Sequence, residues 1–228
     1  MKSDVKLVSY TQPAQELQDV QIKELHELVA YCARVSNPTN QMNTLTSEKI
    51  VQYLIDHKHW SPLEMVNICL EINTTRDIAH QIIRHRSFAF QEFSQRYAAV
   101  NKLDQSFVTR EARLQDKKNR QNSIPLEEDA HDGSLKQMWE EKQKEIITLA
   151  SQTYAWALEN GIAKEQARAV LPEGCTMTRL YMNGTLRSWI HYISLRDKEN
   201  GAQKEHADIA RQCAQVITES NLFRIEKL

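Results

Sequence analysis

Residues 66–73 read Val66-Asn67-Ile68-Cys69-Leu70-Glu71-Ile72-Asn73, an alternation of apolar and mostly polar side chains. Successive side chains of a β-strand point to opposite faces, so this alternation predicts a strand with one buried face. Thr74 and Thr75 follow, and hydroxyl side chains are favoured at the residue that begins a helix. We therefore expect a strand that passes directly into a helix, with the chain leaving that helix near Arg84.

The segments on both sides of this unit predict the remaining elements from their periodicity and their turn residues. We expect strands at 5–10 and 177–182, and helices at 14–35, 46–57, 135–160, 164–172, 185–195 and 203–220. Residues 101–134 are polar and weakly periodic, and predict a loop or excursion that is either a lid or solvated. We expect the aromatic residues of 135–160 to lie in the core, and Arg34 to be a solvated cation rather than an inward ligand.

The composition favours one domain and argues against several classes of protein. With 228 residues but only five Gly and five Pro, the chain has no Gly/Ser-rich linker, so we expect a single domain over 1–228. The 29 Lys and Arg residues are balanced by 30 Asp and Glu, which argues against a general nucleic-acid binder. No apolar run approaches the roughly 20 residues of a membrane span. Four scattered Cys without CxxC spacing, and a start without an apolar signal region, predict a cytoplasmic protein with reduced thiols.

Cations able to bind phosphate are concentrated in residues 84–97. The stretch reads Arg84-His85-Arg86-Ser87-Phe88-Ala89-Phe90-Gln91-Glu92-Phe93-Ser94-Gln95-Arg96-Tyr97. Guanidinium groups bind phosphate oxygens in pairs, and glutamine, serine and a fixed glutamate can recognise a sugar or a base. The alternative is that the cations only complement a helix end and the aromatic rings only fill the core. The interleaving of aromatic and polar groups favours the first interpretation, a nucleotide site.

Two other common kinds of site find little support in the sequence. His57 and His59 lie two residues apart, but no further ligands stand near them at a recognised spacing, so we expect no bound metal. The chain also has no Gly-rich GxGxxG fingerprint, so a dinucleotide is not expected to bind in a Rossmann crevice.

The stretch at 84–97 resembles the signature of the flavin-dependent thymidylate synthases, RHR followed by seven residues and Ser. The matching residues are Arg84, His85, Arg86 and Ser94, with Glu92 and Arg96 fitting the longer form RHRxxSxNExSxR. Further segments resemble the family in the expected order, at 33–36, 59–64, 167–172, 184–191, 195–196 and 203–205. Two positions depart from the longer form. Ala89 lacks the hydroxyl of its first serine, whereas Gln91 keeps an amide where asparagine is frequent.

The resemblance implies an α+β fold, a mixed β-sheet flanked by helices, and a methyltransferase that converts dUMP to dTMP. Methylenetetrahydrofolate would give the one-carbon unit, and FAD reduced by NADPH would give the hydride. The chemistry of this family is not thought to need a cysteine nucleophile, which agrees with four cysteines that show no partner motif. Family members are homotetramers with active sites built across subunits, so the same assembly is implied here.

The resemblance also assigns roles to individual residues. For catalysis it implicates Arg196, which would polarise a uracil carbonyl, and His59, which would lie near the flavin ring. The residues that would bind dUMP are Gln81, Arg84, Glu92, Ser94, Arg96, Arg168 and Arg196. The residues that would contact FAD are Ser61, Glu64, Arg84, His85, Arg86, Glu92, Arg187 and His191.

Two other functions are compatible with the sequence. A single-stranded nucleic-acid binding module would use arginines such as Arg84 and Arg120 on phosphates and rings such as Tyr97 for base stacking. It would be colourless, take up no FAD and bind oligonucleotides in a salt-sensitive manner. A non-catalytic member of the family is suggested by Ala89, and it would bind dUMP without turnover.

Overall fold

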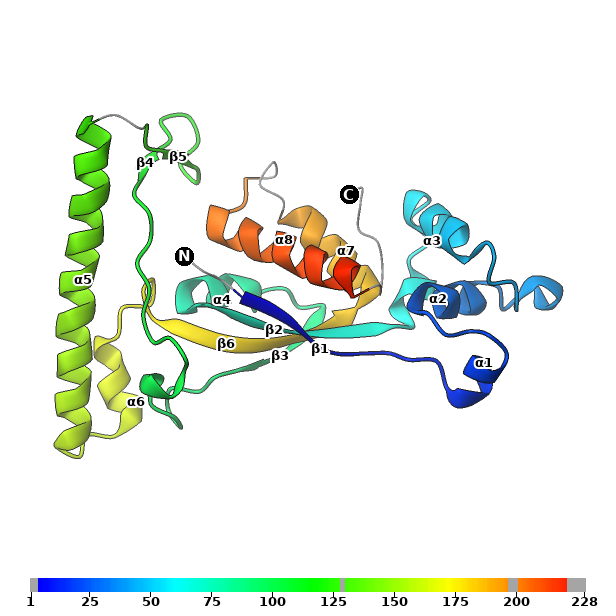
Figure 1. The fold of residues 1–228 in the computed structure, drawn as a ribbon, viewed down its shortest axis with the longest axis horizontal. Helices are drawn as coiled ribbons and strands as arrows, with labels where there is room; N and C mark the ends of the chain where they lie inside the picture. The colour runs from blue at the N-terminus through cyan, green and yellow to red at the C-terminus, as the bar shows by residue number, and fades with distance from the viewer. Residues whose placement is uncertain (1–3, 128–129, 197–200, 221–228) are drawn as a thin grey trace.

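The computed structural model describes residues 4–127, 130–196 and 201–220. The strands are β1 (Asp4–Tyr10), β2 (Asn67–Thr75), β3 (Phe88–Glu92), β4 (Arg113–Gln115), β5 (Ser123–Pro125) and β6 (Met177–Thr185). The α-helices are α1 (Gln15–Asp19), α2 (Leu25–Ala33), α3 (Ser47–Asp56), α4 (Arg76–Ile82), α5 (Ala130–Glu159), α6 (Lys164–Ala167), α7 (Leu186–Leu195) and α8 (Lys204–Glu219). Figure 1 shows an elongated molecule with a sheet in the middle, α5 at one end and α2 and α3 at the other.

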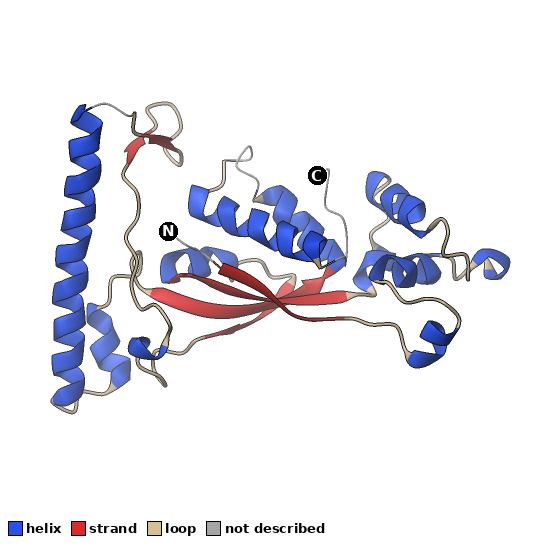
Figure 2. Cartoon of the chain, viewed as in Figure 1, coloured by secondary structure: helices blue, strands red, loops and turns tan. Residues whose placement is uncertain are grey.

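The main sheet has the strand order β1-β2-β6-β3, and its pairings are antiparallel. β6 lies between β2 and β3 and runs opposite to both, so that Gly184 pairs with Ile68 on one side and with Phe88 on the other. The predicted α+β class, with helices flanking a sheet, is confirmed (Figure 2). The sheet was expected to be mixed, but among the described strands its pairings are all antiparallel. β2 and β3 run in the same direction, but β6 separates them, so no parallel pair forms among the described strands.

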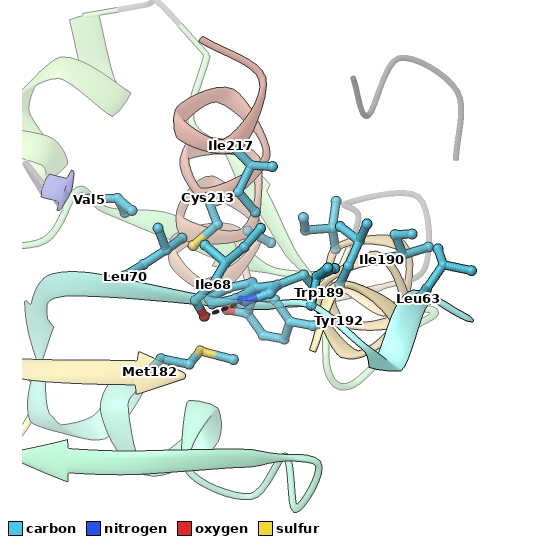
Figure 3. Close-up of a cluster of buried hydrophobic side chains, with 14 of the residues drawn as sticks. Val5, Leu63, Ile68, Leu70, Met182, Trp189, Ile190, Tyr192, Cys213 and Ile217 are labelled. Carbon is cyan, nitrogen blue, oxygen red and sulfur yellow. Dashed lines mark hydrogen bonds between the residues drawn. The ribbon is translucent and has the colours of Figure 1, made fainter. Parts of the chain in front are cut away.

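The core lies between the sheet and the helices α4, α7 and α8, which cover one of its faces (Figures 1 and 2). The alternating residues Ile68, Leu70 and Ile72 of β2 are fully buried, which confirms the strand predicted from them. Trp189 and Tyr192 of α7 pack into this core, and Nε1 of Trp189 donates a hydrogen bond to the backbone oxygen of Ile68 at 2.9 Å (Figure 3). The core therefore joins α7 directly to the central strand.

Residues 14–35, predicted as one helix, form the two helices α1 and α2, so that prediction is wrong. Gln21 has a φ of 74°, a left-handed conformation that interrupts a helix. The carboxylate of Glu27 accepts hydrogen bonds from the backbone N–H groups of Lys23 (2.8 Å) and Glu24 (2.9 Å), and this capping starts α2 at Leu25. The apolar spacing continues across the break and gives no sign of it.

Arg34, at the end of α2, is buried rather than solvated as predicted, with 6% of its surface exposed. Its guanidinium group donates hydrogen bonds to Oγ1 of Thr46, at 2.7 Å, and to the backbone oxygen of Asn43. The cation therefore holds the loop that precedes α3, because a buried guanidinium group needs polar partners.

Residues 101–134, predicted as a loop or excursion, contain regular structure. The β4–β5 hairpin lies within them, and α5 begins at Ala130 rather than at 135. A β-bridge joins Phe107 to Thr176 next to β6, and Arg113 of β4 forms an ion pair with Glu205 of α8. The segment is therefore attached to the body of the protein at more than one point.

Part of α5 that was predicted to lie in the core is instead an exposed apolar surface, which we call the α5 stripe. Its members are Leu135, Trp139, Ile146, Leu149 and Trp156, which are spaced by three, four or seven residues. This spacing puts them on one side of a helix. Leu149 is 66% exposed and Trp156 is 57% exposed. The prediction that the aromatic residues of this helix lie in the core is therefore wrong for Trp139 and Trp156, whereas it is confirmed for Tyr154.

Candidate functional site

Most residues with an expected flavin role gather where β6 ends and β2 and β3 begin, which we call the Gly184 end of the sheet. The register shows this meeting, since Gly184 pairs with both Ile68 and Phe88. A Cβ atom on Gly184 would lie 2.4 Å from Cδ1 of Phe88, so a larger residue would displace that ring. The close approach sets the position of Phe88, and with it the end of the preceding turn at residues 83–87.

Hydrogen bonds join three distant segments at the Gly184 end. Oγ of Ser188, in the first turn of α7, donates to the backbone oxygen of Ser87 at 3.2 Å. Arg187 beside it forms an ion pair with Glu64, with 2.5 Å between Nη1 and Oε1. Glu64 closes the short 3-10 helix Ser61–Glu64 that precedes β2. The turn at 83–87, the start of α7 and the approach to β2 therefore form one unit.

Two guanidinium groups at this end are available to a ligand. Arg84 and Arg86 are exposed, and neither forms an ion pair with another described residue. Ser61 and His191 are exposed as well, and His191 is close enough to influence the titration of His85. These four expected flavin residues are thus presented to solvent, and two of them carry guanidinium cations.

His85 differs from its neighbours because it is held as a neutral acceptor. Nε of Arg196, the residue that ends α7, donates a hydrogen bond to Nε2 of His85 at 2.9 Å. Arginine has no acceptor, so Nε2 must be unprotonated and the ring proton must lie on Nδ1. Burial lowers the pKa of His85 to about 4, with smaller effects from the charges of Arg196 and His191. His85 is therefore neutral near pH 7 and can orient the guanidinium group of Arg196.

A second group of expected ligands lies at the opposite end of β3. Glu92 closes this strand, and its Oε1 accepts hydrogen bonds from Nη1 of Arg76 (3.1 Å) and from Oγ1 of Thr178 (2.9 Å). Arg76 was not singled out by the sequence, because it stands in no motif and only the fold brings it to Glu92. Arg96 forms an exposed ion pair with Glu165 at 3.4 Å.

The two groups are separated by the length of β3. Its five residues, at about 3.3 Å each, span about 16 Å. Ser94 follows the strand at the far end, where Arg168 donates from Nε to the backbone oxygen of Glu165 at 3.3 Å. Gln81 and Arg84 stand before the strand at the near end. One chain therefore divides the expected dUMP residues into two groups instead of gathering them.

A row of hydrogen-bonded polar side chains that the sequence does not reveal runs through Gln81. Nε2 of Gln81 donates to Oε1 of Gln203 at 2.8 Å, and Nε2 of Gln203 donates to Oε2 of Glu205 at 2.9 Å. Nδ1 of His206 lies 3.4 Å from Oε1 of Gln81, and Nε2 of His206 lies 3.1 Å from the hydroxyl of Tyr192. Gln203 is 122 residues from Gln81, so no local spacing could have indicated the contact.

The remaining expectations concern metals, membranes and the two departures from the longer motif. Among the described residues, no group of three His, Cys, Asp or Glu side chains is arranged to hold a metal ion. His57 stacks on Tyr53 with 3.9 Å between ring centroids, and His59 is exposed. No described helix is both long and apolar enough to cross a membrane. Ala89 and Gln91 both lie on the exposed side of β3, so the hydroxyl that Ala89 lacks would not face the core.

Known proteins resemble this chain along most of its length. The family model described as thymidylate synthase complementing protein matches residues 16–220. A probable flavin-dependent thymidylate synthase of Paramecium bursaria Chlorella virus 1 is 46% identical over 212 residues, which cover 93% of this chain and 92% of the relative. A flavin-dependent thymidylate synthase of Synechocystis is 47% identical over 207 residues, which cover 91% of this chain and 90% of the relative.

The fold is also shared with a solved structure. The crystal structure of a UMP/dUMP methylase, PolB from Streptomyces cacaoi, bound with 5-Br dUMP, has a TM-score of 0.77 to this chain at 23% identity. The match covers 97% of this chain and 91% of that chain. At this identity the likeness concerns the fold, whereas the family model and the two relatives concern the sequence itself. On these matches, the chain belongs to the thymidylate synthase complementing protein family, the family of the flavin-dependent thymidylate synthases.

Proposed function

We propose that the chain is a flavin-dependent thymidylate synthase, a methyltransferase that converts dUMP to dTMP. The reaction would attach a one-carbon unit from methylenetetrahydrofolate to C5 of dUMP, with FAD reduced by NADPH as the source of hydride. Besides family membership, the observation that carries the proposal is the Gly184 end. There Glu64, Arg187 and the turn at 83–87 meet from three distant parts of the sequence.

The groups at the Gly184 end fit FAD. A pyrophosphate requires charge-assisted donors, and Arg84 and Arg86 are exposed guanidinium groups without an ion-pair partner among the described residues. The Arg187–Glu64 pair offers a further donor and, in Glu64, an acceptor for hydroxyl groups. Bound FAD, once reduced, supplies the hydride. We assign FAD contacts at this end to Ser61, Glu64, Arg84, His85, Arg86, Arg187 and His191. Glu92 lies at the far end of β3, so its proposed contact with FAD would come from a second copy of the chain.

Arg196 and His59 are proposed as the catalytic residues. His85 accepts the hydrogen bond from Nε of Arg196 and so orients its guanidinium group, whose Nη atoms have no hydrogen-bond partner within the described ranges. We propose that these nitrogens face a uracil carbonyl and stabilise the negative charge that develops on its oxygen. His59, exposed in the segment before β2, is assigned to the flavin ring side.

The cysteines support chemistry without a thiolate nucleophile. All four are free thiols, at positions 32, 69, 175 and 213. Burial raises the pKa of each of these thiols, most strongly that of Cys213, so none is prepared to act as a thiolate near pH 7. Free thiols persist in reducing compartments, and we propose a cytoplasmic location on this basis.

We infer that complete sites form between subunits of a homotetramer. Within one chain, β3 separates the near dUMP group, with Gln81, Arg84 and Arg196, from the far group, with Ser94 and Arg96. A second copy of the chain could bring its far group, including Glu92 and Arg168, to the Gly184 end of the first. The two copies together would then supply all the expected binding residues. The α5 stripe supports association, since a contiguous apolar surface of this kind is characteristic of protein interfaces.

A Leu149→Glu substitution in the α5 stripe is expected to convert the assembly to smaller species. Leu149 is 66% exposed in one chain, so the charge leaves that fold intact, whereas an unpaired carboxylate in an apolar interface costs on the order of 3 kcal/mol. Sedimentation velocity measures the mass. The matched control is Ser151→Glu, which adds the same charge to an exposed position of α5 outside the stripe. An unchanged mass for Leu149→Glu, or a monomeric parent protein, would contradict the proposed interface.

The absorption spectrum of the purified protein, with and without dUMP, tests the proposed function. We expect a flavin spectrum that changes when dUMP is added, and formation of dTMP from dUMP, methylenetetrahydrofolate and NADPH. Replacing NADPH by NADH in the same assay gives the preference for the hydride donor. A colourless protein that takes up no FAD and binds oligonucleotides would overturn the proposal. Binding of dUMP without dTMP formation would instead identify a non-catalytic family member.

A further inference from the structure

The hydrogen bonds in the row of polar side chains around Gln81 all run in one direction, because a buried ion pair fixes one end of the row. Glu205 is 5% exposed and pairs with Arg113 of β4. Burial opposes ionisation of Glu205, but hydrogen bonds from its own backbone N–H, from Arg113 and from Gln203 together hold its pKa below the usual range. The carboxylate is therefore ionised and can only accept hydrogen bonds.

An accepting carboxylate fixes the orientation of the two amides that follow it. Gln203 must turn its NH2 group toward Glu205, which leaves its Oε1 to face Gln81. Gln81 must then turn its own NH2 group toward Gln203, with 2.8 Å between Nε2 and Oε1. An amide without such an anchor has two orientations that differ only by exchange of oxygen and nitrogen. Here the ionised end selects one of them.

The other end of the row agrees with this direction. Oε1 of Gln81 faces Nδ1 of His206, which must carry the ring proton if it is to donate. Nε2 of His206 is then an acceptor, and the hydroxyl of Tyr192 donates to it at 3.1 Å. Burial, followed by the charges of Arg196 and His85, lowers the pKa of His206 to about 3, so the ring is neutral as this arrangement requires. Donation therefore runs without conflict from Tyr192 to Glu205.

We propose that Gln203 and Glu205 are positioning residues for dUMP: anchored by Arg113, they fix the amide of Gln81 so that it offers the substrate one defined N–H donor. Gln81 uses one of its two N–H groups on Gln203, and the second is left for a ligand. This inference rests on the proposed function, because it takes Gln81 as a dUMP ligand. It goes further by making the β4–β5 hairpin, which carries Arg113, part of the machinery that recognises the substrate.

The surroundings of Gln203 allow this role to be tested without unfolding the protein. Gln203 is only half-buried, and it lines an open cavity of about 530 Å³ between the hairpin and α5. Methionine has a similar length and no amide, so Gln203→Met removes both hydrogen bonds and leaves the Arg113–Glu205 pair in place. Glu205→Gln is a poorer choice, because it leaves Arg113 without a buried counter-charge and can prevent folding.

Calorimetric titration of the flavin-loaded protein with dUMP is the test. We expect Gln203→Met to weaken dUMP binding about five- to tenfold, the value of one hydrogen bond, with a matching rise in KM and kcat within about twofold. Gln81→Met should have a similar effect, and the double variant should be no weaker than Gln81→Met alone, because the two residues act as one unit. Flavin absorbance and Tm should stay at parent values.

Gln215→Met is the matched control, since Gln215 is exposed on α8 and bonds only to Glu219, one turn away, among the described residues. Two results would overturn the positioning role and leave the proposed function intact. One is dUMP binding by Gln203→Met that equals that of the parent, and the other is a double variant in which the losses of dUMP affinity from the two substitutions add. A parent protein that binds no dUMP would overturn the proposed function, and the inference with it.

Discussion

An Arg196→Ala variant is expected to lose about 10²- to 10³-fold in kcat/KM for dTMP formation, the effect of removing one donor from a developing oxyanion. In the structure, a hydrogen bond to His85 holds the Arg196 side chain. His85 is neutral and accepts from Nε, which orients the guanidinium group, while its Nη atoms have no hydrogen-bond partner among the described residues. The substitution should weaken dUMP binding more than FAD binding, because the arginine is assigned to the pyrimidine. Equal losses of both ligands would contradict that assignment.

The same substitution should be visible at His85 itself. The positive charge of Arg196 is one of the causes that lower the pKa of this ring to about 4. Removing the charge should raise the pKa, although not to its ordinary value, because burial is the larger cause and remains. An NMR titration of the ring measures this directly. Arg211→Ala is the matched control, since Arg211 is exposed on α8 and pairs with Asp208 outside the site.

Trp189→Ala is expected to lower the free energy of unfolding by about 3–5 kcal/mol, among the largest effects of any core substitution. Trp189 is fully buried, lies 4.9 Å from the ring of Phe88 between centroids, and bonds to the backbone oxygen of Ile68. Trp189→Phe keeps most of the packing but removes the hydrogen bond to Ile68, so we expect a smaller loss of about 0.5–1.5 kcal/mol.

Urea denaturation at a fixed protein concentration compares these variants, because association of subunits would otherwise change the apparent stability. Leu45→Ala serves as the control. Leu45 is 94% exposed, and its truncation should change the free energy of unfolding by less than about 0.5 kcal/mol. A loss at Trp189 no larger than at Leu45 would show that α7 is not held to β2 as the structure indicates.

Elements whose side chains meet solvent on one side and the core on the other were predictable. The alternation at 66–73 marks β2 because burial of one face imposes a period of two. The break between α1 and α2 was not predictable, because it depends on the φ of Gln21 and on the capping by Glu27, while the apolar spacing runs on. The exposed aromatics of α5 were misjudged because an apolar stripe looks the same whether it packs within a chain or between chains.

The motifs predicted candidate members of the site, but they could not predict how the fold arranges them. The motif at 84–97 indicated cations for a nucleotide, and the fold joins the turn at 83–87 to the start of α7, where Arg187 pairs with Glu64. The motif could not reveal that β3 separates two groups of the residues expected to bind dUMP, since that depends on strand length and on which strand pairs with β6. It also could not reveal the contact of Gln81 with Gln203, which arises only when α4 and α8 pack together.

Gly184 limits how this protein could be engineered. Glycine inside a strand is a standard target for thermostabilisation, because a β-branched residue restricts the unfolded chain and packs better in a sheet. Here the new side chain would meet the ring of Phe88, which is wedged against Trp189 and cannot swing aside cheaply. A gain in strand propensity would thus displace the turn that carries the RHR motif. Designs that raise the melting temperature should therefore leave this position unchanged and start from sites remote from β6.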